Sequence, residues 1–390
     1  MTKNRSLARF IGPSALITII GISAAGTPAF QTTAIQNSSP QTAAQQEQAK
    51  ERQNRGRELI KLQDQIKEMQ ARVLELQSLG MEGRHQADLD EKKIDDALLE
   101  KWSREAGIVF AKAAYPSPVD GLSIPTYLFR SSAQAGPNSK PALLWIHPMI
   151  HGSFDSDSFL LVQEAVRRGY VVLAPEYRGS IGYGKDFYDA IDYGGYEVDD
   201  VMGGYDYLKA NVPEVDPARV GMIGWSHGGF ITLHSLIRDQ GRTLKCAYAG
   251  VPVTNLIFRL SFKGPYYEAE FARQKRIGGE VYQKRDIYIE RSPVYHVSKI
   301  KVPVRVHVAT NDQDVNFVEC EMLIHALAYH IPRLAETKIY IDPPGGHDFE
   351  RLLTNDRKAL QNTPAQRDSL NLIWAFLEEH LQPYLQEPKK

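Results

Sequence analysis

The residues GWSHG at positions 224–228 place Ser226 between two glycines, directly after the apolar run 220–223. The apolar run predicts a short buried strand, and the apolar positions after Gly229 predict a helix. A strand that turns sharply into a helix at a G-x-S-x-G sequence holds the serine side chain up in a strained conformation. Ser226 is therefore a candidate nucleophile, provided that the fold supplies a histidine base and a carboxylate to activate its hydroxyl.

Candidates for the base and the carboxylate lie downstream, each in a loop that follows a predicted strand. Asp312 and Asp314 follow the apolar run 303–309, and His347 follows the run 338–342. Open α/β sheets place their sites at the carboxyl ends of the strands, so we expect these loops at one edge of the sheet. The chain order serine, acid, histidine is that of α/β-hydrolases. Position alone leaves open which of the two aspartates is the acid.

The order of predicted elements after residue 107 indicates an α/β fold. Runs such as PALLWI and YVVLAP are continuously apolar, as strands must be when helices cover both faces of a sheet. Helical patterns lie between most of the later strands, which predicts a mainly parallel sheet flanked by helices, preceded by an N-terminal helical segment. The predicted strands cover residues 109–113, 123–129, 142–147, 171–175, 219–224, 245–250, 303–309 and 338–342.

Several separate motifs resemble the catalytic domain of the prolyl oligopeptidase family, which has the α/β-hydrolase fold. GWSHGG resembles the family's G-W-S-x-G-G elbow, and EYRGSIGYGKDF resembles its R-G-S-x-G-Y-G segment. DPPGGHDF resembles its P-G-x-G-H-x-F loop. The resemblance covers about residues 104–385 and implies a catalytic domain over 107–386.

The resemblance also implies roles for the site residues. The family's acid stands three residues before a valine, which here selects Asp312, with Val315, and leaves Asp314 as the alternative. Ser226 would attack an ester or amide carbonyl to form an acyl-enzyme, and His347, oriented by Asp312, would carry the proton. This chemistry needs neither a cofactor nor a metal.

One departure from the family concerns the loop that helps to stabilise the oxyanion. Where the family often has His-Gly-Gly-Pro, this chain has HPMI at 147–150, and a proline has no N–H to donate. We expect the donors to be the backbone N–H groups of His227 and Met149. The side chains of His147 and His151 are the alternatives.

A second departure concerns the β-propeller that gates the site in many family members. Each blade takes roughly 40–50 residues, and the segment before the catalytic domain is too short and too helical in pattern for four blades. We therefore expect no propeller. The acidic residues with which exopeptidase members bind a substrate amine also have no matching segment here.

The segment 255–296 lies between two predicted core strands and is rich in aromatic residues. It is either a cap that shapes the substrate pocket or a helical excursion whose aromatic side chains belong to the core. Its aromatic residues are Phe258, Phe262, Tyr266, Tyr267, Phe271, Tyr282, Tyr288 and Tyr295.

Residues 1–29 have the order of regions found in secretory signals: basic residues, an apolar run over 10–22, then small residues. We expect an exported protein, periplasmic or secreted, with no stable membrane span after cleavage. The alternative is an uncleaved anchor helix, although the apolar run is short for a bilayer. Residues 30–106 are expected to form a linker followed by a heptad-like helical segment, because 30–56 is rich in Gln, Ala, Thr and Ser.

The helical segment contains apolar residues at heptad spacing over 58–79. Gly80 and Gly83 are expected to end this helix before a second one over about 88–106. The segment 58–79 is either a homodimerisation stalk or part of a helical hairpin that packs on its own catalytic domain. The apolar heptad positions are Leu59, Leu62, Ile66, Met69, Val73 and Leu76.

Composition narrows the function further. The formal net charge of −1 and the absence of basic blocks interleaved with aromatics argue against a nucleic-acid partner. Cys246 and Cys320 are expected as two buried thiols, with a single disulfide bond as the alternative.

Taken together, the motifs and the N-terminal segment predict an exported serine hydrolase that acts on a peptide or another small substrate. The alternatives are a carboxylesterase and an inactive hydrolase-like binding protein.

Overall fold

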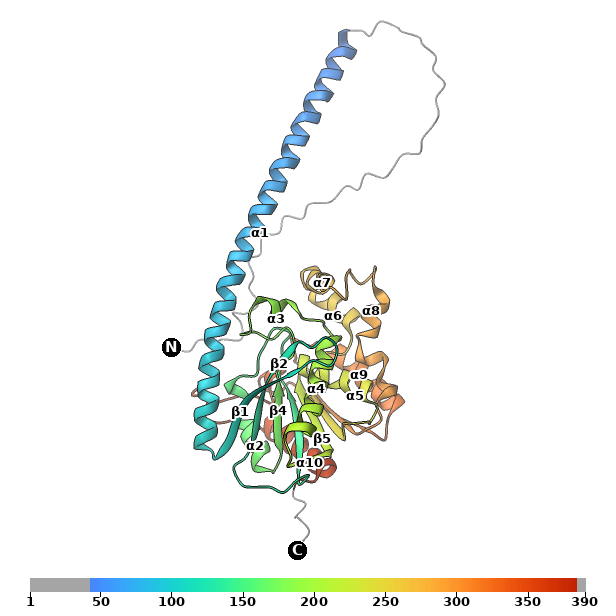
Figure 1. Cartoon of the computed structure of the whole chain (residues 1–390). Helices are drawn as coiled ribbons and strands as arrows, with labels where there is room; N and C mark the ends of the chain where they lie inside the picture. Colours follow the sequence, from blue (N-terminus) through green and yellow to red (C-terminus); the bar gives the residue numbers. More distant parts are fainter. Residues whose placement is uncertain (1–42, 384–390) are drawn as a thin grey trace. The chain divides into compact units, whose positions relative to one another are not determined.

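The structure, a computed structural model, describes residues 43–383, with only some of the side chains described between residues 43 and 82. The chain divides into two units, residues 1–80 and 81–390. The first unit contains the beginning of helix α1, and the second contains its end and all the other elements (Figure 1). The predicted signal over 1–29 lies outside the described residues.

Helix α1 is one continuous helix, Ala43–Glu105, so the prediction of two helices separated near Gly80 and Gly83 is wrong. A glycine inside a helix costs about 1 kcal/mol relative to alanine, and the flanking Gln, Glu, Leu, Met and Lys residues are strong helix formers that offset this cost. The same composition explains why helix replaces the predicted linker from Ala43 onward. Apart from Lys61, the side chains of 58–79 lie outside the described residues, so dimerisation through them stays a prediction.

The end of α1, within the second unit, packs on the catalytic domain. Leu99 and Ser103 are completely buried, and the ring of Trp102 lies 5.8 Å from that of Phe159. Leu99 and Trp102 therefore pack in the hydrophobic core of the catalytic unit, from a single helix rather than a hairpin.

One eight-stranded sheet forms the centre of the catalytic unit, in the order β1-β2-β4-β3-β5-β6-β7-β8. The first pairings, β1 with β2 and β2 with β4, are antiparallel, and all later neighbours are parallel. This arrangement confirms the predicted α/β-hydrolase fold with a mainly parallel sheet. The strands are β1 Ile108–Pro116, β2 Ser123–Ser131, β3 Lys140–Ile146, β4 Val171–Pro175, β5 Val215–Trp225, β6 Cys246–Gly250, β7 Val304–Ala309 and β8 Ala335–Tyr340.

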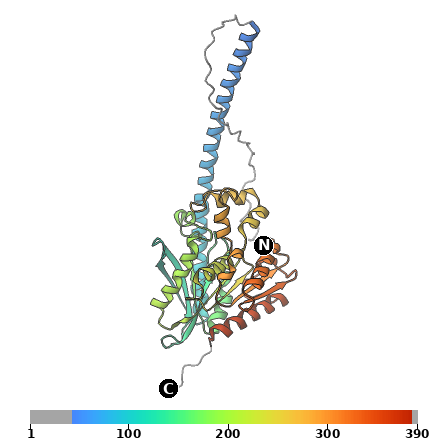
Figure 2. The same ribbon diagram turned by 90° about the vertical axis from the view of Figure 1, so that its right-hand side faces the viewer.

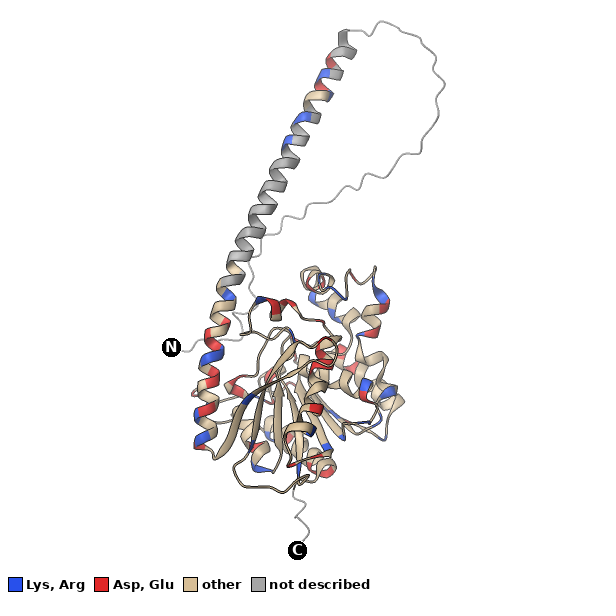
Figure 3. Ribbon diagram, viewed as in Figure 1, with Lys and Arg blue, Asp and Glu red and all other residues tan. Residues whose placement is uncertain are grey.

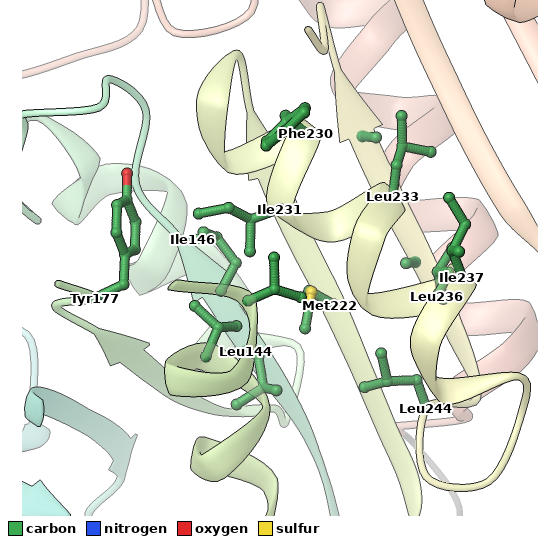
Figure 4. Packing of buried hydrophobic residues seen from close by; sticks show 14 of the residues in the cluster. Leu144, Ile146, Tyr177, Met222, Phe230, Ile231, Leu233, Leu236, Ile237 and Leu244 are labelled. Carbon is green, nitrogen blue, oxygen red and sulfur yellow. The ribbon is translucent and has the colours of Figure 1, made fainter. Parts of the chain in front are cut away.

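Helices cover both faces of this sheet (Figures 1 and 2). Alternate residues of a strand point to opposite faces, so Leu144 and Ile146 join the core under α4, α5 and α9 (Figure 4). Leu143 and Trp145 join the second core, under α1, α2 and α10. The helices are α2 Phe159–Arg167, α3 Lys185–Asp189, α4 Tyr196–Asn211, α5 His227–Asp239, α9 Phe317–His330 and α10 Pro364–Leu381.

The aromatic segment 255–296 contains three short helices, α6 Leu256–Lys263, α7 Pro265–Ala272 and α8 Arg285–Glu290. Its aromatic side chains divide between the two predicted roles. Phe271 and Tyr288 are buried, as in a core. The exposed ones, available to a cap, are Phe262, Tyr266, Tyr282 and Tyr295.

Candidate active site

Ser226 occupies a tight turn between β5 and α5. Its backbone has φ 56° and ψ −119°, a conformation that costs a non-glycine residue about 1–3 kcal/mol. The turn is held by hydrogen bonds from Ser226 N–H to the Gly250 carbonyl and from Phe230 N–H to the Ser226 carbonyl, both 2.9 Å. A Cβ on Gly228 would lie only 2.4 Å from the carbonyl oxygen of Ile146, so the sequence needs glycine there. The strained nucleophile-type turn predicted from G-x-S-x-G is therefore present.

Asp312 and His347 are joined by a hydrogen bond. His347 Nδ1 lies 2.7 Å from Asp312 Oδ2, in the loops after β7 and β8. The other carboxylate oxygen, Oδ1, accepts the backbone N–H groups of Asp314 and Val315 at 2.8 and 2.9 Å. With the carboxylate fixed in this way, the proton of His347 belongs on Nδ1, and Nε2 is left as the basic nitrogen.

Asp314, the alternative acid, points elsewhere. Its side chain is 56% exposed, and its carboxylate lies 3.3 Å from Lys263 Nζ on α6. Burial acts to raise the pKa of this carboxyl, but the nearby charges of His347 and Lys263 bring it below its usual value. The structure thus brings Asp312, and not Asp314, into contact with His347.

Ser226 shares a sheet edge with this pair, because β5, β6, β7 and β8 are successive parallel neighbours. Its side chain is nearly buried, with 9% of the residue exposed. Within the described part of the chain, no hydrogen bond joins its hydroxyl to His347. Such hydrogen bonds are often long in structures without substrate and shorten in the reacting complex.

The predicted oxyanion donors lie at the start of α5 and in the loop after β3. His227 begins α5, so its backbone N–H belongs to the first turn and has no partner within the helix. Met149 has φ 71°, and its carbonyl accepts the hydroxyl of Tyr177 at 2.6 Å, which fixes the orientation of this peptide. The loop that carries Met149 therefore lies in a defined conformation beside the turn at Ser226.

The histidine alternatives for the oxyanion hole are engaged elsewhere. His147 Nε2 lies 2.9 Å from the hydroxyl of Ser180, and burial lowers the pKa of His147 to about 3, so its ring is neutral. His151 Nδ1 donates to the Gly179 carbonyl at 2.8 Å, and its ring stacks on Tyr188. Backbone N–H groups remain the better candidates.

A buried ion pair that the sequence does not predict anchors the end of this loop. Lys92 of α1 places its Nζ 2.5 Å from Glu176 Oε1 and 2.6 Å from the carbonyl of Phe154. The same Glu176 oxygen accepts the N–H of Phe154 at 3.1 Å. Acidic and basic residues are interspersed along this part of α1 (Figure 3), so nothing in the local pattern distinguishes Lys92 from its exposed neighbours. Its partners are distant in sequence, which is why the pair was missed.

The side chain of His227 also has a buried partner. Its Nε2 lies 3.1 Å from Glu197 Oε2 on α4, and the ring of Tyr193 lies 4.4 Å from the imidazole. Glu197 in turn accepts the N–H of Gly194. These contacts fix the residue that follows the nucleophile.

Fold and site geometry together define an α/β-hydrolase with a serine, histidine and aspartate at one sheet edge. The family model described as "Prolyl oligopeptidase family" matches residues 154–383, and the chain belongs to this family. Within the described residues, a helix rather than a propeller precedes the catalytic sheet. No helix there combines the length and the apolar character needed to cross a membrane.

Relatives of known name support this assignment. The chain is 28% identical over 295 residues to an uncharacterized peptidase, YuxL, of Bacillus subtilis, covering 75% of this chain and 42% of that protein. It is 30% identical over 246 residues to dipeptidyl aminopeptidase BIII of Pseudoxanthomonas mexicana, covering 60% and 34%. The chain thus spans less than half the length of these relatives.

Solved structures share the fold. The acylaminoacyl peptidase of Pyrococcus horikoshii has a TM-score of 0.58 at 19% identity, over 73% of this chain and 43% of that one. A puromycin-hydrolyzing peptidase of Mycobacterium tuberculosis has a TM-score of 0.57 at 21% identity, over 70% and 40%. At these identities the likeness concerns the fold alone.

Proposed function

We propose that this chain is a serine hydrolase that cleaves peptide or amide bonds through an acyl-enzyme. The observation that carries the proposal is the 2.7 Å hydrogen bond between Asp312 and His347 at the sheet edge that also holds the strained turn of Ser226. Ser226 attacks the carbonyl, His347 takes its proton and returns it to the leaving amine, and Asp312 stabilises the imidazolium. The N–H groups of His227 and Met149 stabilise the oxyanion.

A peptide is the substrate class that the comparisons support. The named relatives are peptidases, and none of those described above is named as an esterase. A serine hydrolase that cleaves amides also turns over activated esters, because the ester leaving group needs less protonation. Ester turnover alone would therefore leave the peptidase proposal intact.

The test compares N-acetyl-aminoacyl p-nitroanilides with p-nitrophenyl esters of the same acyl group. We expect the wild type to release both chromophores and Ser226→Ala to lose about six orders of magnitude in kcat. Ser235→Ala is the matched control, because Ser235 is a buried serine of α5 whose hydroxyl has no partner within the described residues. Full anilide activity in Ser226→Ala would contradict the proposal, and ester activity without anilide activity would indicate a carboxylesterase.

We further propose that the chain is exported with residues 1–29 as its signal, and that two copies pair through 58–79. The supports are the basic, apolar and small-residue order of the first segment and the heptad spacing of the second. N-terminal sequencing of secreted protein tests the first proposal. Light scattering of the full chain against a chain lacking 30–80 tests the second, and a monomeric full chain would contradict it.

A further inference from the structure

A buried carboxylate outside the proposed triad lies close to all three of its chain segments. Glu350 follows His347 by three residues and is 1% exposed. It accepts hydrogen bonds from four side chains on four different elements: Trp225 Nε1 of β5 at 2.5 Å, the Tyr248 hydroxyl of β6 at 2.6 Å, His307 Nδ1 of β7 at 3.0 Å, and the Ser369 hydroxyl of α10.

The direction of these hydrogen bonds follows from the chemistry of the partners. An indole N–H can only donate. Arg305 Nε donates to His307 Nε2 at 2.8 Å, so that nitrogen is an acceptor and the proton of a neutral His307 lies on Nδ1. This proton is shared between Glu350 at 3.0 Å and the Ser369 hydroxyl at 2.7 Å, which itself donates to Glu350. Burial lowers the pKa of His307, in agreement with the neutral ring. Every partner therefore donates, and Glu350 is a carboxylate.

The contacts of Glu350 link the segments that carry the proposed triad. Trp225 directly precedes Ser226 in the chain, and β7, which contains His307, ends three residues before Asp312. His347 lies on the same short segment as Glu350 itself. One carboxylate thus bonds to the nucleophile strand and the acid strand while belonging to the loop of the base.

The packing around these contacts leaves little freedom. A Cβ on Gly250 would lie 2.4 Å from the Trp225 ring and 2.8 Å from Glu350 Oε2. The carbonyl of this glycine also accepts the N–H of Ser226. A shift of the Glu350 carboxylate would therefore be transmitted to the turn that holds the serine.

We infer that Glu350 is a positioning residue of the hydrolase, which aligns Ser226, Asp312 and His347 by binding the strands and the loop that carry them. It touches none of the reacting atoms. The inference rests on the proposed function. It differs from a role in folding alone, because misalignment of the triad lowers kcat in molecules that are fully folded.

The experiment measures kcat and KM of Glu350→Gln for an N-acetyl-aminoacyl p-nitrophenyl ester, well below the unfolding temperature of the variant. Glutamine keeps the shape but replaces one acceptor oxygen by an amide NH2 group, a donor that faces other donors. We expect kcat per folded molecule to fall at least about 100-fold while KM changes less than about threefold. Glu379→Gln, an exposed glutamate of α10, is the matched control and should behave as wild type.

A second pair of variants covers the case in which Glu350→Gln does not fold. Trp225→Phe and Tyr248→Phe each remove one donor to Glu350, but only Trp225 adjoins the nucleophile. We expect Trp225→Phe to lower kcat at least fivefold more than Tyr248→Phe. Unchanged kcat in folded Glu350→Gln, or equal effects of the two aromatic variants, would overturn the inference. An inactive wild type would instead overturn the proposed function.

Discussion

The candidate site has two halves, one that carries the triad and one that carries the oxyanion loop. Each half is held in place by a different buried carboxylate, and the two carboxylates have different hydrogen-bond partners. In the half that carries the triad, Glu350 is bound by four neutral side-chain donors from the sheet and α10. In the half that carries the oxyanion loop, Glu176 is paired with the ammonium of Lys92, 84 residues away on α1. Both carboxylates are fully buried. One half is therefore organised within the sheet, and the other depends on a helix that precedes it.

The pKa values of the Glu176 and Glu350 carboxyl groups are shifted in opposite directions. Burial raises the pKa of Glu176 above its usual value, and Lys92 offsets only part of that effect. Burial also acts to raise the pKa of Glu350, but the hydrogen bonds from His307, Ser369 and Tyr248 bring it below the usual value. The donors around Glu350 thus stabilise its charge more than Lys92 and the Phe154 N–H stabilise that of Glu176. Because Lys92 binds both Glu176 and the Phe154 carbonyl, the end of α1 is part of the active-site scaffold.

The largest expected effect lies in the triad half. Asp312→Asn should lower kcat by about four orders of magnitude, because the amide no longer holds His347 in the tautomer that accepts the serine proton. Asp314→Asn, in the same loop but facing Lys263, should change kcat less than about threefold. Steady-state kinetics on the activated ester decide the ranking, and the reverse order would move the acid to Asp314.

In the oxyanion half, loss of the Lys92 ammonium should have the largest effect on stability. Lys92→Met leaves Glu176 buried without its partner, which should lower the free energy of unfolding by about 3–5 kcal/mol. Lys93→Met is the control, because Lys93 is exposed beside Asp90 and should cost less than about 0.5 kcal/mol. Denaturant titration of both variants provides the comparison. Equal stabilities would show that the end of α1 does not anchor this half.

Removing both charges should cost less than removing one. The double variant Lys92→Met/Glu176→Leu has no uncompensated buried charge, and replacing such a pair by apolar residues is often neutral. Phe154 N–H loses its acceptor, which keeps a penalty of about 1–3 kcal/mol. The double variant should therefore unfold at a higher denaturant concentration than Lys92→Met. If it were less stable, the pairing with Lys92 would not explain the single variant.

The smallest effect is a difference in pH dependence. A lowered folded-state pKa means that Glu350 adds stability above the unfolded value near 4.5, and this stability is lost as the pH falls through the folded value. The raised pKa of Glu176 has the opposite sign, so its protonated form favours folding at low pH and stability is lost as the pH rises.

The free energy of unfolding of the wild type minus that of Glu350→Gln should therefore increase from pH 4 to pH 7. The free energy of unfolding of the wild type minus that of Glu176→Gln should decrease over the same range. Parallel slopes would remove the distinction between the two halves.

The sequence predicts the residues whose chemistry requires a fixed local motif. Ser226 and His347 each stand in a glycine-containing turn after a predicted strand, and the resemblance to the prolyl oligopeptidase family selects Asp312 through its spacing to Val315. Lys92 and Glu350 have no such local pattern, because their partners lie 19 to 125 residues away. Only the strand order brings Trp225, Tyr248 and His307 together. The prediction of helix ends near Gly80 and Gly83 is wrong for a different reason. Good helix formers on both sides outweigh the free-energy cost of each glycine.

Covalent labelling with a fluorophosphonate probe tests most directly the claim that Ser226 is an activated nucleophile. The probe reacts only with a serine whose proton a neighbouring base removes. The account predicts stoichiometric labelling of the wild type, mapped by mass spectrometry to the peptide containing Ser226, and none in Ser226→Ala. Ser235→Ala should label as wild type. Undiminished labelling of Ser226→Ala, or a modified residue outside the turn between β5 and α5, would contradict the account.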